Sequence, residues 1–163
     1  MSNTPFRPLV AAAALALVAL PLAAQSTPAG AKSASDAVEE FMRAAADSNL
    51  TRMGQLFGTD KGSAAATGNP ADFPKRMVVM QAALHGIRVK AHAETPMGKK
   101  NHVLVTTELA RGACKVTVPI TAVKAKSGWL VREFDLNAIW EGINRPCEGT
   151  GASGNTGGAP GVQ

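Results

Sequence analysis

Tyrosine is absent from the 163-residue sequence, and aromatic residues make up only 4% of it. The absence of a phenol excludes mechanisms that use tyrosine as an acid, a nucleophile or an oxyanion donor. Cysteine occurs twice, without the Cys-x-x-Cys spacing of redox and zinc sites. Charged residues are also few, at 18%, while hydrophobic residues reach 45%. This composition is typical of a globular chain of one domain and excludes a disordered or multi-span membrane protein.

Dense basic clusters are absent as well. The formal net charge is +5, but the cations are scattered in small groups such as Lys75-Arg76 and Lys99-Lys100, without interleaved aromatics. This pattern argues against nucleic acid as a partner. The histidines His85, His92 and His102 lack the helical spacing of a zinc motif, and no phosphate-binding or nucleophile motif occurs, so we expect no metal and no cofactor.

The N-terminus has the layout of a secretory signal peptide. Arg7 lies in a short polar start, an apolar run extends from Leu9 to Leu22, and small residues end at Ala24. The apolar run is shorter than the ~20 residues of a membrane-spanning helix, so a retained anchor is the weaker alternative. We therefore expect residues 1–24 to be cleaved near Ala24 and the protein to be exported, to the periplasm or outside the cell.

The two cysteines, Cys114 and Cys147, predict one disulfide in an exported chain. The bridge would close a loop of roughly 34 residues. Composition divides the remaining chain into a flexible spacer at 25–33, a folded domain at 34–147 and a disordered Gly-rich tail at 148–163.

Three helices are predicted in the first half of the domain. The first begins near Ser35-Asp36, with Asp36 and Glu39 spaced as in a capping box, and has an apolar face at helical spacing. The second follows the capping residues 47–49 and ends at Gly58. After a small-residue loop at 58–74, a third helix is expected from Lys75 to His85. Its apolar face is broadened by Val78 and Val79.

Beyond Gly86 the period changes from 3.6 to 2, which predicts strands. Turn residues separate four of them, at 87–94, 102–111, 113–124 and 129–136, after which the chain leaves the sheet. The expected fold class is α+β, with three N-terminal helices packed on a curved four-stranded antiparallel meander.

Four features resemble the nuclear-transport-factor-2-like superfamily, which includes SnoaL-type and ketosteroid-isomerase-like proteins. They are Ala37-Val38-Glu39-Glu40-Phe41, the passage from Asp47 and Leu50 to Leu56-Phe57, a third helix before the meander, and Gly128-Trp129-Leu130-Val131. The resemblance covers about 35–137 and implies a cystatin-like cone with a pocket at its open end. Ketosteroid isomerases use an acidic base and a tyrosine donor, so with no tyrosine here no catalytic residue is carried over.

The last strand holds the strongest candidates for chemistry. One face carries Glu133 and Asp135 and the other carries Arg132, so an ionisable group points into the cone unless a bulge resets the alternation. A carboxylate in an apolar pocket can act as a base, and an arginine there can bind an anion. The simpler alternative is that these charges are solvated at the rim. The pocket candidates are Phe41, Phe57, Met80, Trp129, Arg132 and Asp135.

These observations favour a non-enzymatic binding module for a small apolar molecule or a protein partner, at the cone mouth or the open sheet face. One alternative is an isomerase, lyase or hydrolase that uses Asp135 or Glu133. Another is an envelope-associated structural protein whose Lys99-Lys100 tip contacts anionic surfaces. A homodimer remains open, although the polar outer positions of the first strand (Arg88, Lys90, His92 and Glu94) disfavour a dry interface there.

Overall fold

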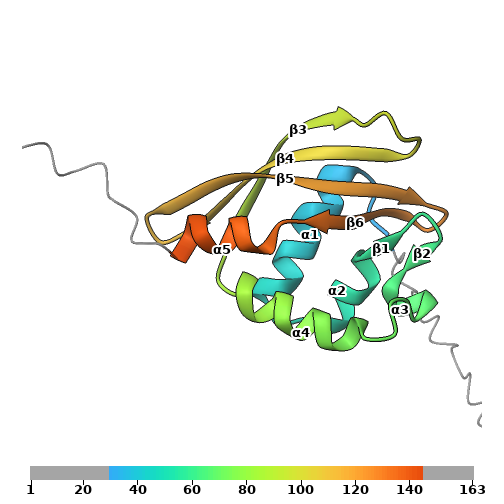
Figure 1. The fold of residues 1–163 in the computed structure, drawn as a ribbon, viewed down its shortest axis with the longest axis horizontal. Coiled ribbons are helices and arrows are strands. Elements are labelled where there is room, and N and C mark those ends of the chain that lie inside the picture. Colours follow the sequence, from blue (N-terminus) through green and yellow to red (C-terminus); the bar gives the residue numbers. More distant parts are fainter. Residues whose placement is uncertain (1–29, 145–163) are drawn as a thin grey trace, which may run out of the picture.

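A computed structural model describes residues 30–144 as helices packed against one antiparallel sheet (Figure 1). The elements in chain order are α1 (Ala34–Ala46), α2 (Leu50–Leu56), β1 (Gly58–Thr59), β2 (Gly62–Ser63), α3 (Ala64–Thr67), α4 (Phe73–Leu84), β3 (Arg88–Pro96), β4 (His102–Arg111), β5 (Cys114–Ala125), β6 (Gly128–Phe134) and α5 (Leu136–Asn144). The predicted α+β class is confirmed. The signal peptide, Cys147 and the Gly-rich tail lie outside the described residues, so export and the disulfide stay predictions.

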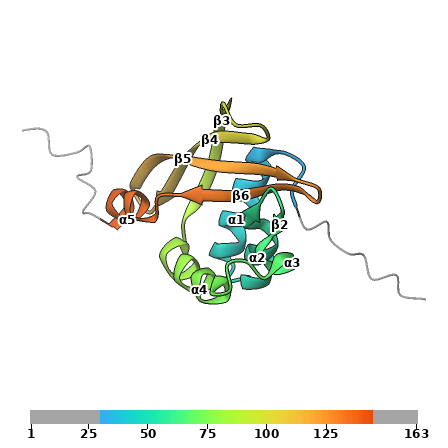
Figure 2. The same ribbon diagram turned by 45° about the vertical axis from the view of Figure 1, so that its right-hand side comes forward.

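The sheet has the strand order β3-β4-β5-β6 and curves around α1, which contacts all four strands (Figures 1 and 2). In the two middle strands, Val105, Leu109, Val118 and Ile120 are buried against the helices. They follow the period of two that a sheet with one buried face requires. In the described part of the chain, no helix is both long and apolar enough to span a membrane.

The start of α1 differs from its prediction. Ser33 is the N-cap, and its Oγ accepts a hydrogen bond from the Asp36 backbone N–H at 3.0 Å. Glu39 makes no capping box; its Oε1 accepts from the Ala91 backbone N–H on β3 instead. Ala31 pairs with Trp129 through two backbone hydrogen bonds. The end of the predicted flexible spacer at 25–33 is therefore an ordered strand-like segment along the edge of β6.

A bulge at His92 overturns the predicted outward position of Glu94. Ala91 pairs with Thr107 and Ala93 with Thr106, so His92 is an additional residue on β3. The bulge inverts the faces beyond it, and the Glu94 carboxylate accepts hydrogen bonds from the backbone N–H and Oγ of Ser35, at 2.8 and 2.7 Å. The acid therefore satisfies donors in the first turn of α1.

The predicted loop at 58–74 contains regular structure. The short strands β1 and β2 form a hairpin, and α3 follows with Ser63 as its N-cap. The third predicted helix, now α4, begins two residues earlier and ends one residue earlier than expected, and Gly86 follows in the left-handed region at φ +73°.

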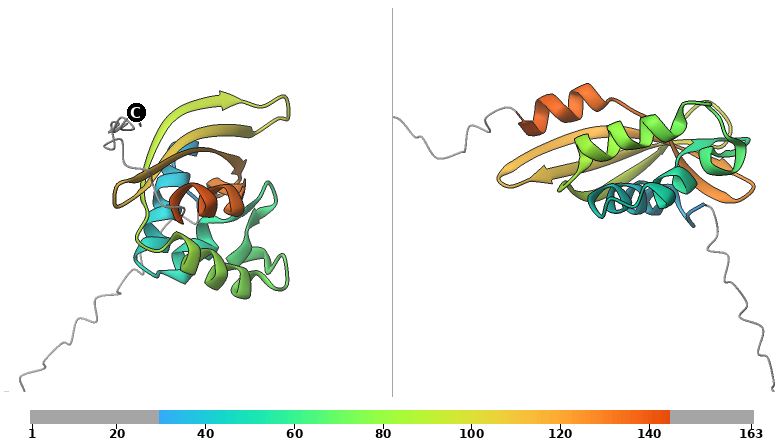
Figure 3. Two further views of the ribbon diagram at one scale, coloured as in Figure 1. Left: turned by 60° about the vertical axis from the view of Figure 1, so that its left-hand side comes forward. Right: turned by 90° about the horizontal axis from the view of Figure 1, so that it is seen from below.

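The helix α5 was not predicted. It folds back under the sheet, with Ile139 and Ile143 in the core (Figure 3). Gly142 allows this approach, because a Cβ there would lie 2.5 Å from Cγ2 of Val116 on β5. The helix therefore closes one end of the cone that the resemblance left open.

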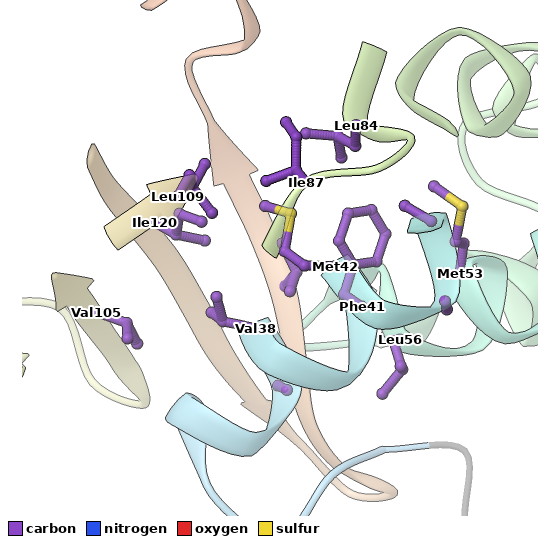
Figure 4. Close-up of a cluster of buried hydrophobic side chains, with 14 of the residues drawn as sticks. Val38, Phe41, Met42, Met53, Leu56, Leu84, Ile87, Val105, Leu109 and Ile120 are labelled. Carbon is purple, nitrogen blue, oxygen red and sulfur yellow. The ribbon is translucent and has the colours of Figure 1, made fainter. Parts of the chain in front are cut away.

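The core lies between α1 and the sheet (Figure 4). Phe41, Met42, Met53 and Leu56 are at most 1% exposed and contribute much of its volume. Burial of such side chains stabilises the fold by about 1.5–3 kcal/mol each, and it holds α1 and α2 firmly against the sheet.

Candidate functional site

A cleft of about 550 Å³ opens between α4, the end of β6 and the start of α5. Its volume is within the range of small-molecule sites, roughly 300–1,000 Å³. Residues from one face of α4, from β6 and from two element ends line it: Phe57, Asp72, Lys75, Arg76, Val79, Met80, Arg132, Glu133, Phe134 and Leu136.

A bulge in β6 decides which side chains face the helices. Val131 pairs with Ala122 and Glu133 pairs with Thr121, so Arg132 is an additional residue without a partner position on β5. Val131 and Phe134 consequently both face the helices, while Glu133 is exposed. Strict alternation did not decide which face of this strand points toward the helices. The bulge at Arg132 decides it, and it turns the carboxylates of Glu133 and Asp135 away from the core.

Three aromatic rings connect the cleft to the core. Phe57 and Phe134 line the cleft, and the fully buried Phe41 lies behind them, with ring centroids 6.0 Å and 5.9 Å away. Tilted aromatic pairs at such distances are favourable beyond their burial. The apolar floor is therefore held in place by the core.

The apolar wall on α4 remains open to solvent. Val79 lines the cleft and is 61% exposed, although the sequence analysis placed it on the broadened buried face of this helix. When a ligand covers exposed apolar surface in a concave site, that surface is removed from water and the free energy of the complex is lowered.

The charged groups of the cleft fall into paired and unpaired sets. Asp72 accepts two hydrogen bonds from Nε of Arg76, both at 3.0 Å. Within residues 30–144, neither Lys75 nor Arg132 makes a side-chain ion pair or hydrogen bond. Arg132 is half-buried, whereas Lys75 and Glu133 are exposed at the rim.

Asp135 has a structural role and does not line the cleft. Its Oδ1 accepts hydrogen bonds from the backbone N–H groups of Asn137 and Ala138, at 2.9 and 3.0 Å. These are the second and third residues of α5, which makes Asp135 the N-cap of that helix. The carboxylate that the sequence offered as a base is thus occupied with a helix end.

The structure brings together three of the six predicted pocket residues, Phe57, Met80 and Arg132. Phe41 lies behind the floor, and Trp129 lies at the start of β6, with the Lys124 ammonium 5.9 Å from its ring. Val79 and Lys75 also line the cleft, although they were not among the predicted pocket residues. Their signal was the spacing of 72, 75, 76 and 79, which places these side chains on one face of a helix.

No group of three or more His, Cys, Asp or Glu side chains suited to a metal ion occurs between residues 30 and 144. The structure also separates the histidines. His102 lies at the β3–β4 turn, where its Nδ1 is 2.9 Å from the Lys100 carbonyl oxygen, whereas His92 lies at the β3 bulge.

No family model matches the chain, and no curated protein matches its sequence. Solved structures match in fold. An NTF2-like protein of unknown function from Cytophaga hutchinsonii is 13% identical, with 68% of this chain and 96% of that chain covered and a TM-score of 0.39. A protein of unknown function with a cystatin-like fold from Nostoc punctiforme is also 13% identical, with coverages of 64% and 94% and a TM-score of 0.40.

An LEH-like epoxide hydrolase from M. tuberculosis is 19% identical, with coverages of 68% and 89% and a TM-score of 0.32. The first two of these structures are named NTF2-like and cystatin-like, the terms of the resemblance stated from the sequence. At such identities the likeness concerns the fold and carries no residue role or activity to this chain.

Proposed function

We propose that the protein is a non-enzymatic binding module that takes a small, largely apolar molecule into the cleft between α4 and β6. The observation that carries this proposal is the apolar floor of Phe57, Met80 and Phe134, open to solvent through the exposed Val79. The cleft is lined by residues of α4 and β6 and by the C-cap residue of α2. The core holds these elements in place, and the cleft does not depend on a loose loop. A preformed apolar hollow of this volume is the usual form of a small-molecule site.

The placement of the acids supports binding over catalysis. A general base needs a carboxylate within reach of the bound molecule and an environment that keeps it there. Asp135 instead caps α5, and Glu133, although it lines the cleft, is exposed to solvent at the rim rather than held in an apolar environment. The enzyme that the sequence analysis kept as an alternative therefore has less support than a binding module.

Two neighbouring valines on α4 provide a matched test. Val79 lines the cleft, whereas Val78 is also exposed, at 51%, but lies over the separate shallow groove between α2 and α4. Val79→Trp should fill the cleft and abolish binding of the uncharged fluorescent probe N-phenylnaphthylamine. Val78→Trp should leave its affinity within about twofold. Equal affinity for the wild type and V79W, or no binding at all, would contradict the proposal.

We further propose that the module works outside the cytoplasm, on the basis of the N-terminal sequence pattern. Mass spectrometry of protein purified from its own host should find a chain that begins just after Ala24. A chain that retains residues 1–24 would contradict cleavage.

A further inference from the structure

We infer that the ligand of the cleft is an amphipathic anion, an apolar molecule with a carboxylate that binds Arg132 and Lys75. This inference rests on the proposed function and names the chemical class of the ligand. It starts from the two cations of the cleft that have no partner within residues 30–144.

Arg132 is placed by an irregularity of the backbone. As the additional residue of the β6 bulge, it has no cross-strand neighbour on β5 that could pair with its side chain. Bulges often direct a side chain toward a site in this way. A half-buried guanidinium that makes no hydrogen bond to the described residues leaves its five donors available, and a carboxylate can accept from two of them in bidentate geometry.

Lys75 lies on the opposite wall, in the first turn of α4. Cations at this end of a helix oppose the macrodipole and raise the free energy of the helix. Arg76 is compensated by Asp72, but Lys75 is not. The position of Lys75 is therefore not explained by stability, whereas an anion between the helix N-terminus, Lys75 and Arg132 is stabilised by all three.

The two carboxylates of the cleft, Asp72 and Glu133, do not cancel the positive charge of Lys75 and Arg132. Asp72 is engaged with Arg76 at 3.0 Å, which leaves Glu133 as the acid that opposes an anion. Glu133 is exposed and adjacent to Arg132 in sequence, yet the two side chains form no ion pair. Because water screens an exposed rim charge, we expect Glu133 to weaken anion binding only modestly.

Beneath these cations lies the apolar floor, which includes Met80, Phe134 and Leu136. A ligand that satisfies both features has a compact apolar body and one anionic end. A simple inorganic anion would leave the floor uncovered, and a neutral apolar molecule would make no charge-assisted hydrogen bond with Arg132.

The test uses decanoate, decanamide and decylamine, which share one apolar chain and differ in charge. Their affinities are measured by displacement of N-phenylnaphthylamine at low salt. Decanoate should bind about tenfold more tightly than decanamide, as expected for one charge-assisted interaction, and decylamine should bind most weakly. Salt should reduce the difference between decanoate and decanamide.

The variants separate charge from packing. Arg132→Met should weaken decanoate about tenfold and leave decanamide unchanged, which also shows that the cleft remains folded. Lys75→Met should weaken decanoate about two- to threefold because this side chain is exposed, and Glu133→Gln should tighten it slightly. Lys90→Met, which removes an exposed cation on β3 far from the cleft, is the control and should change nothing.

The outcomes distinguish the two proposals. If the probe binds and V79W blocks it, but decanoate and decanamide displace it equally, the anion inference is overturned while the binding function stands. If R132M weakens both ligands equally, Arg132 acts through packing and the inference is again overturned. If V79W has no effect on the probe, the proposed function itself fails.

Discussion

Asp135 is a residue whose sequence context and structural role point in different directions. In the sequence it follows an alternating strand and resembles an acid that faces a pocket. In the structure, its Oδ1 accepts from two backbone N–H groups in the first turn of α5. A side chain held in this way stabilises a helix end and is not available as a base.

Asp135→Ala should therefore lower the free energy of unfolding by about 1 kcal/mol, because two donors of α5 lose their acceptor. Asp135→Ser should retain most of the stability, since a hydroxyl also caps helices. Urea denaturation measures both. Equal stability of the wild type and D135A would contradict the capping role, and ligand affinity should be the same in all three proteins.

Other residues of the candidate site could be predicted only in part. Phe57 and Met80 were found because apolar residues at helical spacing mark the inner face of an element. Arg132 was named, but its direction was not known, because a bulge has no signature in a single sequence of alternating residues. Val79 was assigned to the buried side because hydrophobicity alone does not tell a core residue from one that lines an open cleft.

At the scale of elements, α5 is the clearest omission. Leu136, Ile139, Trp140 and Ile143 recur at helical spacing behind an aspartate N-cap, so the pattern was present in the sequence. The middle strands were predictable because their alternation is long and one face is buried. The β1–β2 hairpin and α3 were not, since two- and four-residue elements are too short to produce a period.

The close approach of α5 to β5 leads to a prediction about Gly142. A methyl group there would lie 2.5 Å from Cγ2 of Val116, so the helix must shift. Although alanine favours helices by up to about 1 kcal/mol, overpacking costs about 1–3 kcal/mol, and Gly142→Ala should destabilise the protein.

Thermal unfolding of G142A and of the double variant G142A/V116A tests this contact. Removing the two Val116 methyl groups makes space, so the second substitution should cost much less in the G142A background than in the wild type. Strict additivity of the two effects would contradict a direct clash.

At the scale of the whole molecule, the same contact bears on the predicted disulfide. Gly142 touches Val116, two residues after Cys114, so the end of α5 lies beside the start of β5. Cys147, outside the described residues, follows Gly142 by five positions. A disulfide that closes a loop of roughly 34 residues would add about 3–4 kcal/mol to the free energy of unfolding in the chain-entropy model.

The double variant C114S/C147S should therefore unfold at markedly lower denaturant concentration than the oxidised protein. Reduction of the wild type should produce a similar loss and add the mass of two hydrogens. An unchanged mass after reduction would contradict the bridge.

The distribution of lysines gives the molecule one basic end. The β3–β4 and β5–β6 turns lie at the same end of the sheet, together with the β1–β2 turn (Figure 1). These turns and their flanks carry Lys61, Lys99, Lys100, Lys124 and Lys126. The chain enters the described domain at this end through Gly30, which donates to the Ser127 carbonyl oxygen.

This arrangement extends the sequence-based expectation of contact with anionic surfaces. We expect binding to vesicles that contain phosphatidylglycerol at low salt. Lys99→Ala/Lys100→Ala should weaken it about thirtyfold, since each lysine near such a surface contributes about 1 kcal/mol. The charge-matched Arg88→Ala/Lys90→Ala variant should bind like the wild type. Binding that is insensitive to salt or to the Lys99 and Lys100 substitutions would contradict a charge-driven contact.

The additional residue in β6 also has a consequence for how this protein can change over evolutionary time. Loss of the single codon for Arg132 would restore unbroken alternation and keep the present pairing, with Glu133 still outward and Phe134 still inward, so only the guanidinium would be lost. A one-residue gap in this strand would therefore mark homologues that keep the apolar residues of the cleft but have lost its half-buried cation, and with it any preference for an anionic guest.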